Sequence, residues 1–138
     1  MKIILASHGS LADAMLKVLH MIMGDEDDVE AFCLDTYENP FALSDAVKKK
    51  IDAAGAPVIL VCDIMSGSIF NQLLPLCAGP GVTLFTGMNL NLILSLVNIK
   101  PNTEDELEEV LKDAKTGIDV FNAQILENLK NENDADSF

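Results

Sequence analysis

The sequence is poor in basic residues, and this scarcity excludes whole classes of partner. Only 9 Lys and Arg stand against 22 Asp and Glu, which gives a formal net charge of -13. A chain this acidic repels both a phosphate backbone and an anionic membrane surface, so we expect no nucleic-acid binding. The charge favours a protein partner with a basic or apolar docking face.

Cysteine is also scarce, and its spacing excludes two further kinds of site. The three cysteines, Cys33, Cys62 and Cys77, are odd in number, form no CxxC pair and are accompanied by only two histidines. They match neither a disulfide framework nor a set of zinc ligands. We therefore expect a reduced, cytoplasmic protein without a bound metal.

Long apolar runs are missing as well. No stretch reaches the ~18 uncharged apolar residues that a membrane-spanning helix needs. Met1 and Lys2 lead directly into a short apolar run, so we expect no signal peptide. A chain of 138 residues, about half of them apolar and few of them Gly or Pro, is instead typical of one folded domain.

Short apolar runs alternate with amphipathic segments along most of the chain. The runs predict buried strands, and the segments between them carry apolar residues at helical spacing. This alternation predicts an α/β fold with an open, mostly parallel four-stranded sheet and helices on both faces. The predicted strands are 3–6, 29–34, 58–62 and 82–86, and the predicted helices are 11–23, 40–51, 69–74, 90–97 and 104–114.

The C-terminal part of the chain is less regular. Residues 117–121 combine a glycine with alternating apolar residues, a pattern that fits either a continued helix or a fifth strand. The segment 127–138 is rich in Asn, Asp and Glu, which predicts a disordered acidic tail. We therefore place the domain at residues 1–126.

Two polar turns that follow predicted strands form the candidate site. If the strand order is 2-1-3-4, the first and third strands are neighbours, and ligands bind at the crevice between their carboxyl ends. His8 follows the first strand, and Asp63 follows the third. A carboxylate that accepts a hydrogen bond from Nδ1–H leaves the Nε2 lone pair as the nucleophile. The alternative is that Asp63 caps the next helix.

The turn Ser66-Gly67-Ser68 lies near the same crevice. It is too short for a Walker loop and lacks the lysine of that motif. Its amides, together with the N-terminus of the following helix and the Ser68 hydroxyl, have the chemistry to hold one phosphoryl group. The candidate phosphate-binding residues are Gly9, which permits the sharp turn beside His8, and Ser66, Gly67 and Ser68.

Four segments together resemble a known family, the IIA domains of the mannose-type bacterial sugar phosphotransferase system. The resemblance covers residues 1–126. Its motifs are Ile4-Leu5-Ala6-Ser7-His8-Gly9, Met21-Ile22-Met23-Gly24, Asp63 with Ser66-Gly67-Ser68-Ile69-Phe70-Asn71, and Gly87-Met88-Asn89-Leu90.

The resemblance implies a role for each candidate residue. His8 is the phosphorylated histidine, Asp63 orients it, and Ser68 binds the phosphate. Phospho-HPr donates the phosphoryl group to Nε2, and a separate IIB domain accepts it and serves the membrane IIC and IID permease. No cofactor is needed. The family forms homodimers that exchange an antiparallel C-terminal strand, which falls at residues 117–121 here.

The chain departs from the family pattern at two positions that carry no chemistry. Ser66-Gly67-Ser68-Ile69 replaces Gly-Gly-Ser-Pro, and Asn91 replaces a proline. Two rival functions stay open, the phosphotransfer subunit of a dihydroxyacetone kinase and a small tetrapyrrole metal chelatase. The chelatase needs further metal ligands, for which the chain offers only His20 as a second histidine. A regulatory module in which His8 is sensed rather than used is a third alternative.

Overall fold

Four parallel strands form the centre of the molecule. The structure, a computed structural model, describes residues 1–55 and 57–136. The sheet has the order β2-β1-β3-β4, and each pair of neighbouring strands runs parallel, so the predicted order is confirmed. The strands are β1 (Lys2–Ser7), β2 (Val29–Cys33), β3 (Val58–Cys62) and β4 (Val82–Phe85).

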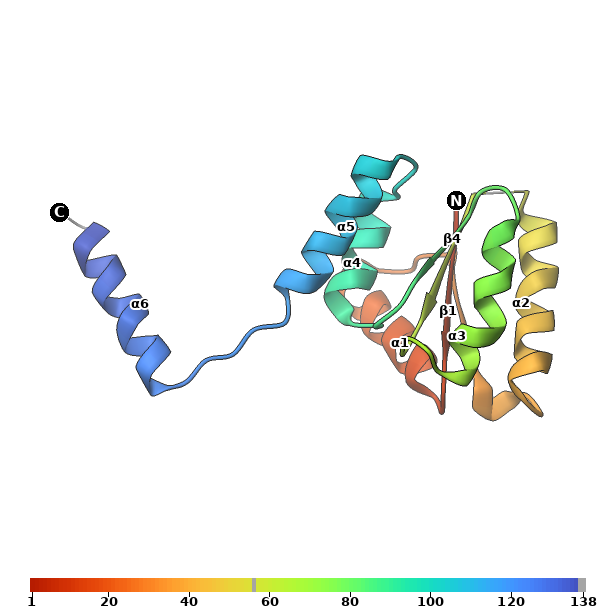
Figure 1. Cartoon of the computed structure of the whole chain (residues 1–138), viewed down its shortest axis with the longest axis horizontal. Helices are drawn as coiled ribbons and strands as arrows, with labels where there is room; N and C mark the ends of the chain where they lie inside the picture. The colour runs from red at the N-terminus through yellow and green to blue at the C-terminus, as the bar shows by residue number, and fades with distance from the viewer. Residues whose placement is uncertain (56, 137–138) are drawn as a thin grey trace.

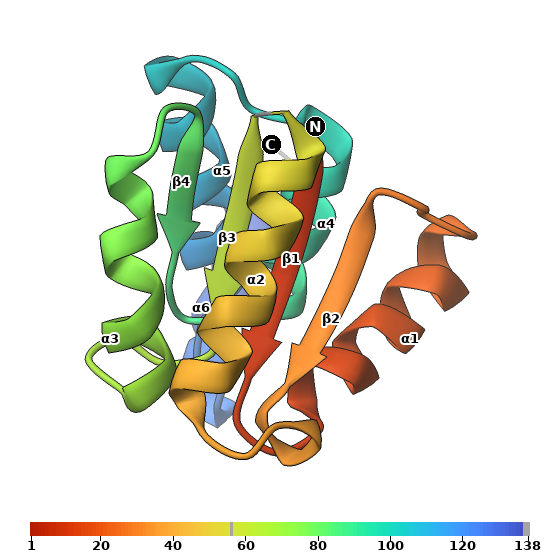
Figure 2. The same ribbon diagram turned by 90° about the vertical axis from the view of Figure 1, so that its right-hand side faces the viewer.

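Helices cover both faces of the sheet, as predicted. Figures 1 and 2 show α1, α4 and α5 on one face and α2 and α3 on the other. Within residues 1–55 and 57–136, no helix combines the length and apolar composition needed to cross a bilayer. The helices are α1 (Leu11–Met23), α2 (Pro40–Ala54), α3 (Ser68–Leu73), α4 (Leu90–Ile99), α5 (Glu104–Thr116) and α6 (Ala123–Asp136), with 3-10 turns η1 (Leu34–Thr36) and η2 (Leu74–Ala78).

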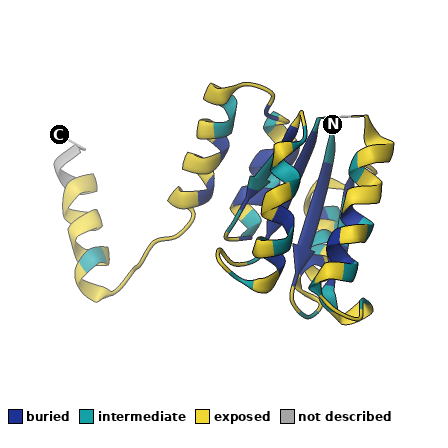
Figure 3. Ribbon diagram, turned by 45° about the vertical axis from the view of Figure 1, so that its right-hand side comes forward, coloured by how far each residue is buried: buried dark blue, intermediate teal, exposed yellow. Residues whose placement is uncertain are grey.

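The core has two halves because successive strand residues point to opposite faces. Ile3 and Leu5 of β1 pack with α1, α4 and α5, whereas Ile4 and Ala6 pack with α2 and α3. All five residues of β3 are buried, as expected for a central parallel strand covered on both sides. Figure 3 shows this buried centre and its exposed outer helices.

A side chain from the end of β1 stabilises the turn between β1 and α1. Ser10 directly precedes α1, yet its side chain makes no capping hydrogen bond. The fully buried Ser7 hydroxyl instead accepts a hydrogen bond of 2.7 Å from the Ala12 amide. Ser7 therefore joins the end of β1 to the first turn of α1, and His8 lies between these two anchored points.

The C-terminal segment consists of an irregular stretch followed by one further helix. α5 ends at Thr116, and residues 117–122 form neither a helix nor a strand. Residues 123–136 are helical, where a disordered tail was expected from residue 127, and residues 137 and 138 lie outside the described part. Asn122 starts this helix, since its Oδ1 accepts a hydrogen bond of 2.9 Å from the Ile125 amide. In Figure 1, α6 stands away from the rest of the molecule.

Removing the Ser7 hydroxyl tests its role in the turn. We expect Ser7→Ala to lower the free energy of unfolding by about 1 to 2 kcal/mol, because the Ala12 amide loses its partner. Urea unfolding followed by circular dichroism measures the change. Ser10→Ala is the matched control and should change the stability by less than about 0.5 kcal/mol. Equal losses in the two variants would contradict this assignment.

Candidate functional site

The topology brings His8 and Asp63 together at the carboxyl edge of the sheet. β1 and β3 are hydrogen-bonded neighbours, with Ala6 in register with Cys62. Each candidate residue therefore follows the end of one of two adjacent strands. Gly9 adopts a φ of +52°, a conformation that suits glycine, and lets the chain turn sharply after His8. The His8 side chain is 45% exposed, and that of Asp63 only 12%.

The Asp63 carboxylate accepts two hydrogen bonds from His8, one from its backbone and one from its ring. Its Oδ2 accepts one hydrogen bond from the His8 backbone amide at 2.8 Å and another from His8 Nδ1 at 2.9 Å. Its Oδ1 accepts a third from the Ile64 amide at 3.0 Å. The next helix, α3, is preceded by Gly67 and not by Asp63, so the carboxylate acts on His8 rather than capping that helix.

The same contacts settle which ring nitrogen is free to react. An ionised carboxylate only accepts hydrogen bonds, so Nδ1 carries the ring proton and Nε2 keeps a lone pair. Ser68 Oγ lies 3.1 Å from Nε2 and donates its hydroxyl proton to that lone pair. The ring is thus held at both nitrogens, with Nε2 as its nucleophilic atom.

The loop between β3 and α3 folds tightly against the ring. A Cβ at Gly67 would lie 2.9 Å from the Ile64 side chain and 3.5 Å from His8 Cε1, so a larger residue would require the Ile64 side chain to move. Ser66 adopts a φ of +63°, which is strained for a residue other than glycine. Such strain concentrates at functional sites, where the surrounding structure enforces it.

The loop after β4 contacts the backbone of Asp63. The sequence alone predicted no role for this loop in the site. The Met88 amide lies 3.2 Å from the Cys62 carbonyl and 3.3 Å from the Asp63 carbonyl and donates to both. Gly87, with a φ of +78°, lets the chain return toward β3 at this point. The sequence feature that could have indicated this support is the Gly87-Met88-Asn89 turn, which follows the fourth predicted strand as the candidate turns follow the first and third.

Other reactive side chains do not compete with His8. Burial, with a further contribution from Asp63, raises the pKa of the Cys62 thiol to about 11, so it stays protonated at neutral pH. His20 lies in the last turn of α1, roughly 14 Å along the helix from Leu11. Its Nε2 is buried without a hydrogen-bond partner. In the part of the chain that the structure describes, no three His, Cys, Asp or Glu side chains gather into a metal-binding group.

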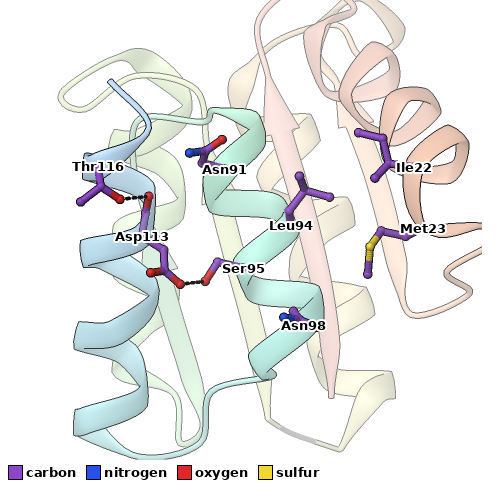
Figure 4. A pocket seen from close by; sticks show the side chains of 8 residues that line it. All are labelled: Ile22, Met23, Asn91, Leu94, Ser95, Asn98, Asp113 and Thr116. Carbon is purple, nitrogen blue, oxygen red and sulfur yellow. Dashed lines mark hydrogen bonds between the residues drawn. The ribbon is translucent and has the colours of Figure 1, made fainter. Parts of the chain in front are cut away.

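A surface hollow of about 440 Å³ lies over α1, α4 and α5, but it contains none of these residues. Ser95 Oγ donates to Asp113 Oδ2 at 2.7 Å, and Thr116 Oγ1 donates to the Asp113 carbonyl at 2.9 Å (Figure 4). These polar groups join α4 to α5 and satisfy one another. The lining residues are Ile22, Met23, Asn91, Leu94, Ser95, Asn98, Asp113 and Thr116.

Comparison with known proteins identifies the family of this chain. Residues 2–115 match the family model of the phosphotransferase system fructose IIA component. A structure from Klebsiella pneumoniae, named as a phosphoenolpyruvate-dependent sugar phosphotransferase system permease, shares 30% identity with a TM-score of 0.79, covering 90% of this chain and 93% of that one.

Two further solved structures have the same fold. A phosphotransferase IIA protein associated with the fucose utilization operon of Streptococcus pneumoniae is 26% identical, with a TM-score of 0.74 and coverage of 91% of this chain and 94% of that chain. A mannose/sorbose specific IIA subunit from Enterococcus faecalis is 20% identical, with a TM-score of 0.70 and coverage of 88% and 94%. At that identity the last match supports the fold alone.

The family match spans most of the chain and includes both turns that hold His8 and Asp63. The resemblance noted in the sequence is therefore confirmed. This chain belongs to the mannose-type IIA family of the bacterial sugar phosphotransferase system.

Proposed function

We propose that this chain is a cytoplasmic phosphocarrier that accepts a phosphoryl group from phospho-HPr on His8 and passes it to a IIB domain. Family membership supports a phosphotransfer role in sugar uptake. The observation that carries the proposal is the His8 ring itself, which Asp63 holds at Nδ1 and which presents Nε2 at an exposed edge of the sheet. The family match favours this function over the dihydroxyacetone kinase subunit and the chelatase.

The transfer step needs no cofactor. The Nε2 lone pair attacks the phosphorus of the donor's phosphohistidine, the new Nε2–P bond forms, and the donor's N–P bond breaks. The electron pair of the broken bond returns to the donor imidazole. The Nδ1 proton stays in its hydrogen bond to Asp63, whose negative charge stabilises the ring as it gains positive character. Attack by a nucleophilic side chain of IIB on the same phosphorus then regenerates His8.

Ser68 is well placed to serve both states of His8. Before transfer its hydroxyl donates to Nε2. Once Nε2 carries phosphorus it no longer accepts, and the hydroxyl is free to turn to a phosphoryl oxygen. The amides of the Gly9 turn and of Ser66, Gly67 and Ser68 supply further donors. We assign Ser66 a contribution through its backbone, because its positive φ sets the shape of the loop.

The surroundings of His8 suit docking by another protein. Ile64 and Met65 are 58% and 65% exposed and belong to the loop after Asp63, which approaches the ring at Gly67. Exposed apolar side chains next to a reactive group indicate a contact surface. HPr and IIB would use this surface in turn, and the acidic chain selects partners with a basic rim. The IIC and IID permease is then reached only through IIB.

We also propose a homodimer that exchanges the C-terminal arm, residues 117–122. Ile118, Val120 and Phe121 are 65% to 74% exposed, and neighbouring exposed apolar side chains of this kind indicate a contact surface. The edge of β4 borders a hollow of about 310 Å³ against α5, whose lining includes Leu84, Leu107 and Leu111. An antiparallel arm from a second copy would extend the sheet there and cover these side chains.

The mass of the intact protein after incubation with enzyme I, HPr and phosphoenolpyruvate tests the phosphocarrier function. The wild type should gain one acid-labile phosphoryl group, and His8→Ala should gain none while keeping its circular dichroism spectrum. Asp63→Asn should slow the gain by roughly a hundredfold or more, because an amide has one acceptor oxygen for contacts that now use two. Transfer by Asp63→Asn at the wild-type rate would show that the carboxylate does not orient His8.

The two serines of the loop should differ in effect. Ser68→Ala removes a hydroxyl donor to a charged group and should slow transfer roughly 10- to 100-fold. Ser66→Gly keeps the backbone and relieves the positive φ, so it should transfer within about twofold of wild type and unfold with up to about 1 kcal/mol more free energy. Rapid-quench assays and urea unfolding measure these effects. A large loss of transfer in Ser66→Gly would assign a direct role to the Ser66 hydroxyl instead.

Analytical ultracentrifugation tests the arm. The wild type should sediment as a dimer, and the double variant Val120→Asp/Phe121→Asp as a monomer, since both faces of the arm then carry charge that its apolar contact surface cannot bury. Leu126→Asp in α6 is the matched control and should stay dimeric. A monomeric Leu126→Asp beside a dimeric arm variant would place the interface on α6 rather than on the arm.

A further inference from the structure

The side chain of Asn89 joins the start of α4 to the end of α5. Its Oδ1 accepts a hydrogen bond of 2.7 Å from the Leu92 amide, which caps the N-terminus of α4. Its Nδ2 donates at 3.2 Å to the carbonyl of Ala114, in the last turn of α5. One half-buried carboxamide thus satisfies both an orphan donor and an orphan acceptor of two different helices.

The Ala114 carbonyl depends on this contact. The last four carbonyls of an α-helix lack intrahelical partners. At the end of α5, the Asp113 carbonyl receives the Thr116 hydroxyl at 2.9 Å and the Lys115 carbonyl receives the Ile118 amide at 3.2 Å. The Ala114 carbonyl receives Asn89, and Ala114 itself is only 7% exposed. Loss of the Asn89 donor would therefore leave a poorly solvated acceptor at the end of α5 and release the Asn89 side chain from that helix.

The peptide that precedes Asn89 reaches the active site. The Met88 amide donates to the carbonyls of Cys62 and Asp63, and the Met88 side chain is buried in the core beside Phe85 and Leu92. Any shift of Asn89 toward or away from α5 displaces this peptide. The displacement reaches the backbone of Asp63, whose carboxylate holds both the amide and Nδ1 of His8.

We propose that Asn89 is a positioning residue for phosphotransfer. It fixes the Met88 peptide against α5, and through that peptide it sets the orientation of Asp63 and His8. The inference rests on the proposed phosphocarrier function. Because Asn89 acts on the orientation of the ring and not on the docking surface at Ile64 and Met65, its loss should change the rate within the complex and not the affinity for the donor.

The test compares two cap variants. Asn89→Ser keeps a capping oxygen for α4 but cannot reach Ala114. Thr103→Ala is the matched control, since Thr103 Oγ1 caps the other end of α5 by accepting from the Glu106 amide at 3.2 Å, roughly 16 Å along the helix from Ala114. Transfer from phospho-HPr is measured over a range of donor concentrations, and the Nδ1 and Nε2 resonances of His8 are recorded by nitrogen-15 NMR.

We expect Asn89→Ser to lower the maximal transfer rate roughly 3- to 30-fold, with an unchanged half-saturating concentration of phospho-HPr and shifted His8 nitrogen resonances. Thr103→Ala should leave the maximal rate, the half-saturating concentration and the His8 resonances at their wild-type values. If Asn89→Ser does not fold, Asn89→Asp replaces it, because the carboxylate keeps the capping acceptor and lacks the donor.

Two results would overturn the proposal. One is a wild-type maximal rate with unshifted His8 resonances in a folded Asn89 variant, and the other is an equal loss in Thr103→Ala. Failure of the proposed function is a separate outcome, in which the wild type itself takes up no phosphoryl group. The His8 resonances of the two variants then still decide whether Asn89 positions the ring.

Discussion

The geometry of the candidate site depends on the contact between the Asp63 carboxylate and the His8 ring. Two oxygens of one side chain receive three N–H groups, from the His8 amide, from His8 Nδ1 and from the Ile64 amide. The first and third of these contacts fix the two loops, and the second fixes the ring. Because the carboxylate is mostly buried while the imidazole is nearly half exposed, the orienting group is shielded and the reacting atom is accessible.

A parallel sheet makes this contact possible for residues that are 55 positions apart in the chain. Its central strands β1 and β3 are neighbours although β2 lies between them in sequence, so their carboxyl ends meet at a switch point where the next helices leave on opposite faces. The buried Ser7 hydroxyl and the Met88 amide then hold the two loops from opposite sides. His8 is therefore rigidly positioned even though it lies in a surface turn.

The outer surface of the molecule combines a strong negative charge with exposed apolar side chains. Two of the places where apolar side chains are exposed are the loop after Asp63 and the C-terminal arm. The proposed function assigns a brief contact to the first of these surfaces and a lasting contact with a second copy of the chain to the other. Asn89 lies between them, since its side chain connects the loop behind Asp63 to the helix from which the arm departs.

The sequence by itself determined the α/β fold, the strand order and the approach of His8 to Asp63. Periodicity and turn chemistry act over a few residues, and parallel topology leaves few arrangements of the strands. Only the tertiary structure decided that Ser7 and not Ser10 caps α1, that Ser68 bonds to Nε2, and that Met88 supports Asp63. It also decided that residues 117–122 form neither a helix nor a strand in the single chain, where the local pattern fitted either one. Such contacts depend on register and on loop conformations, such as the positive φ of Ser66, that no local pattern specifies.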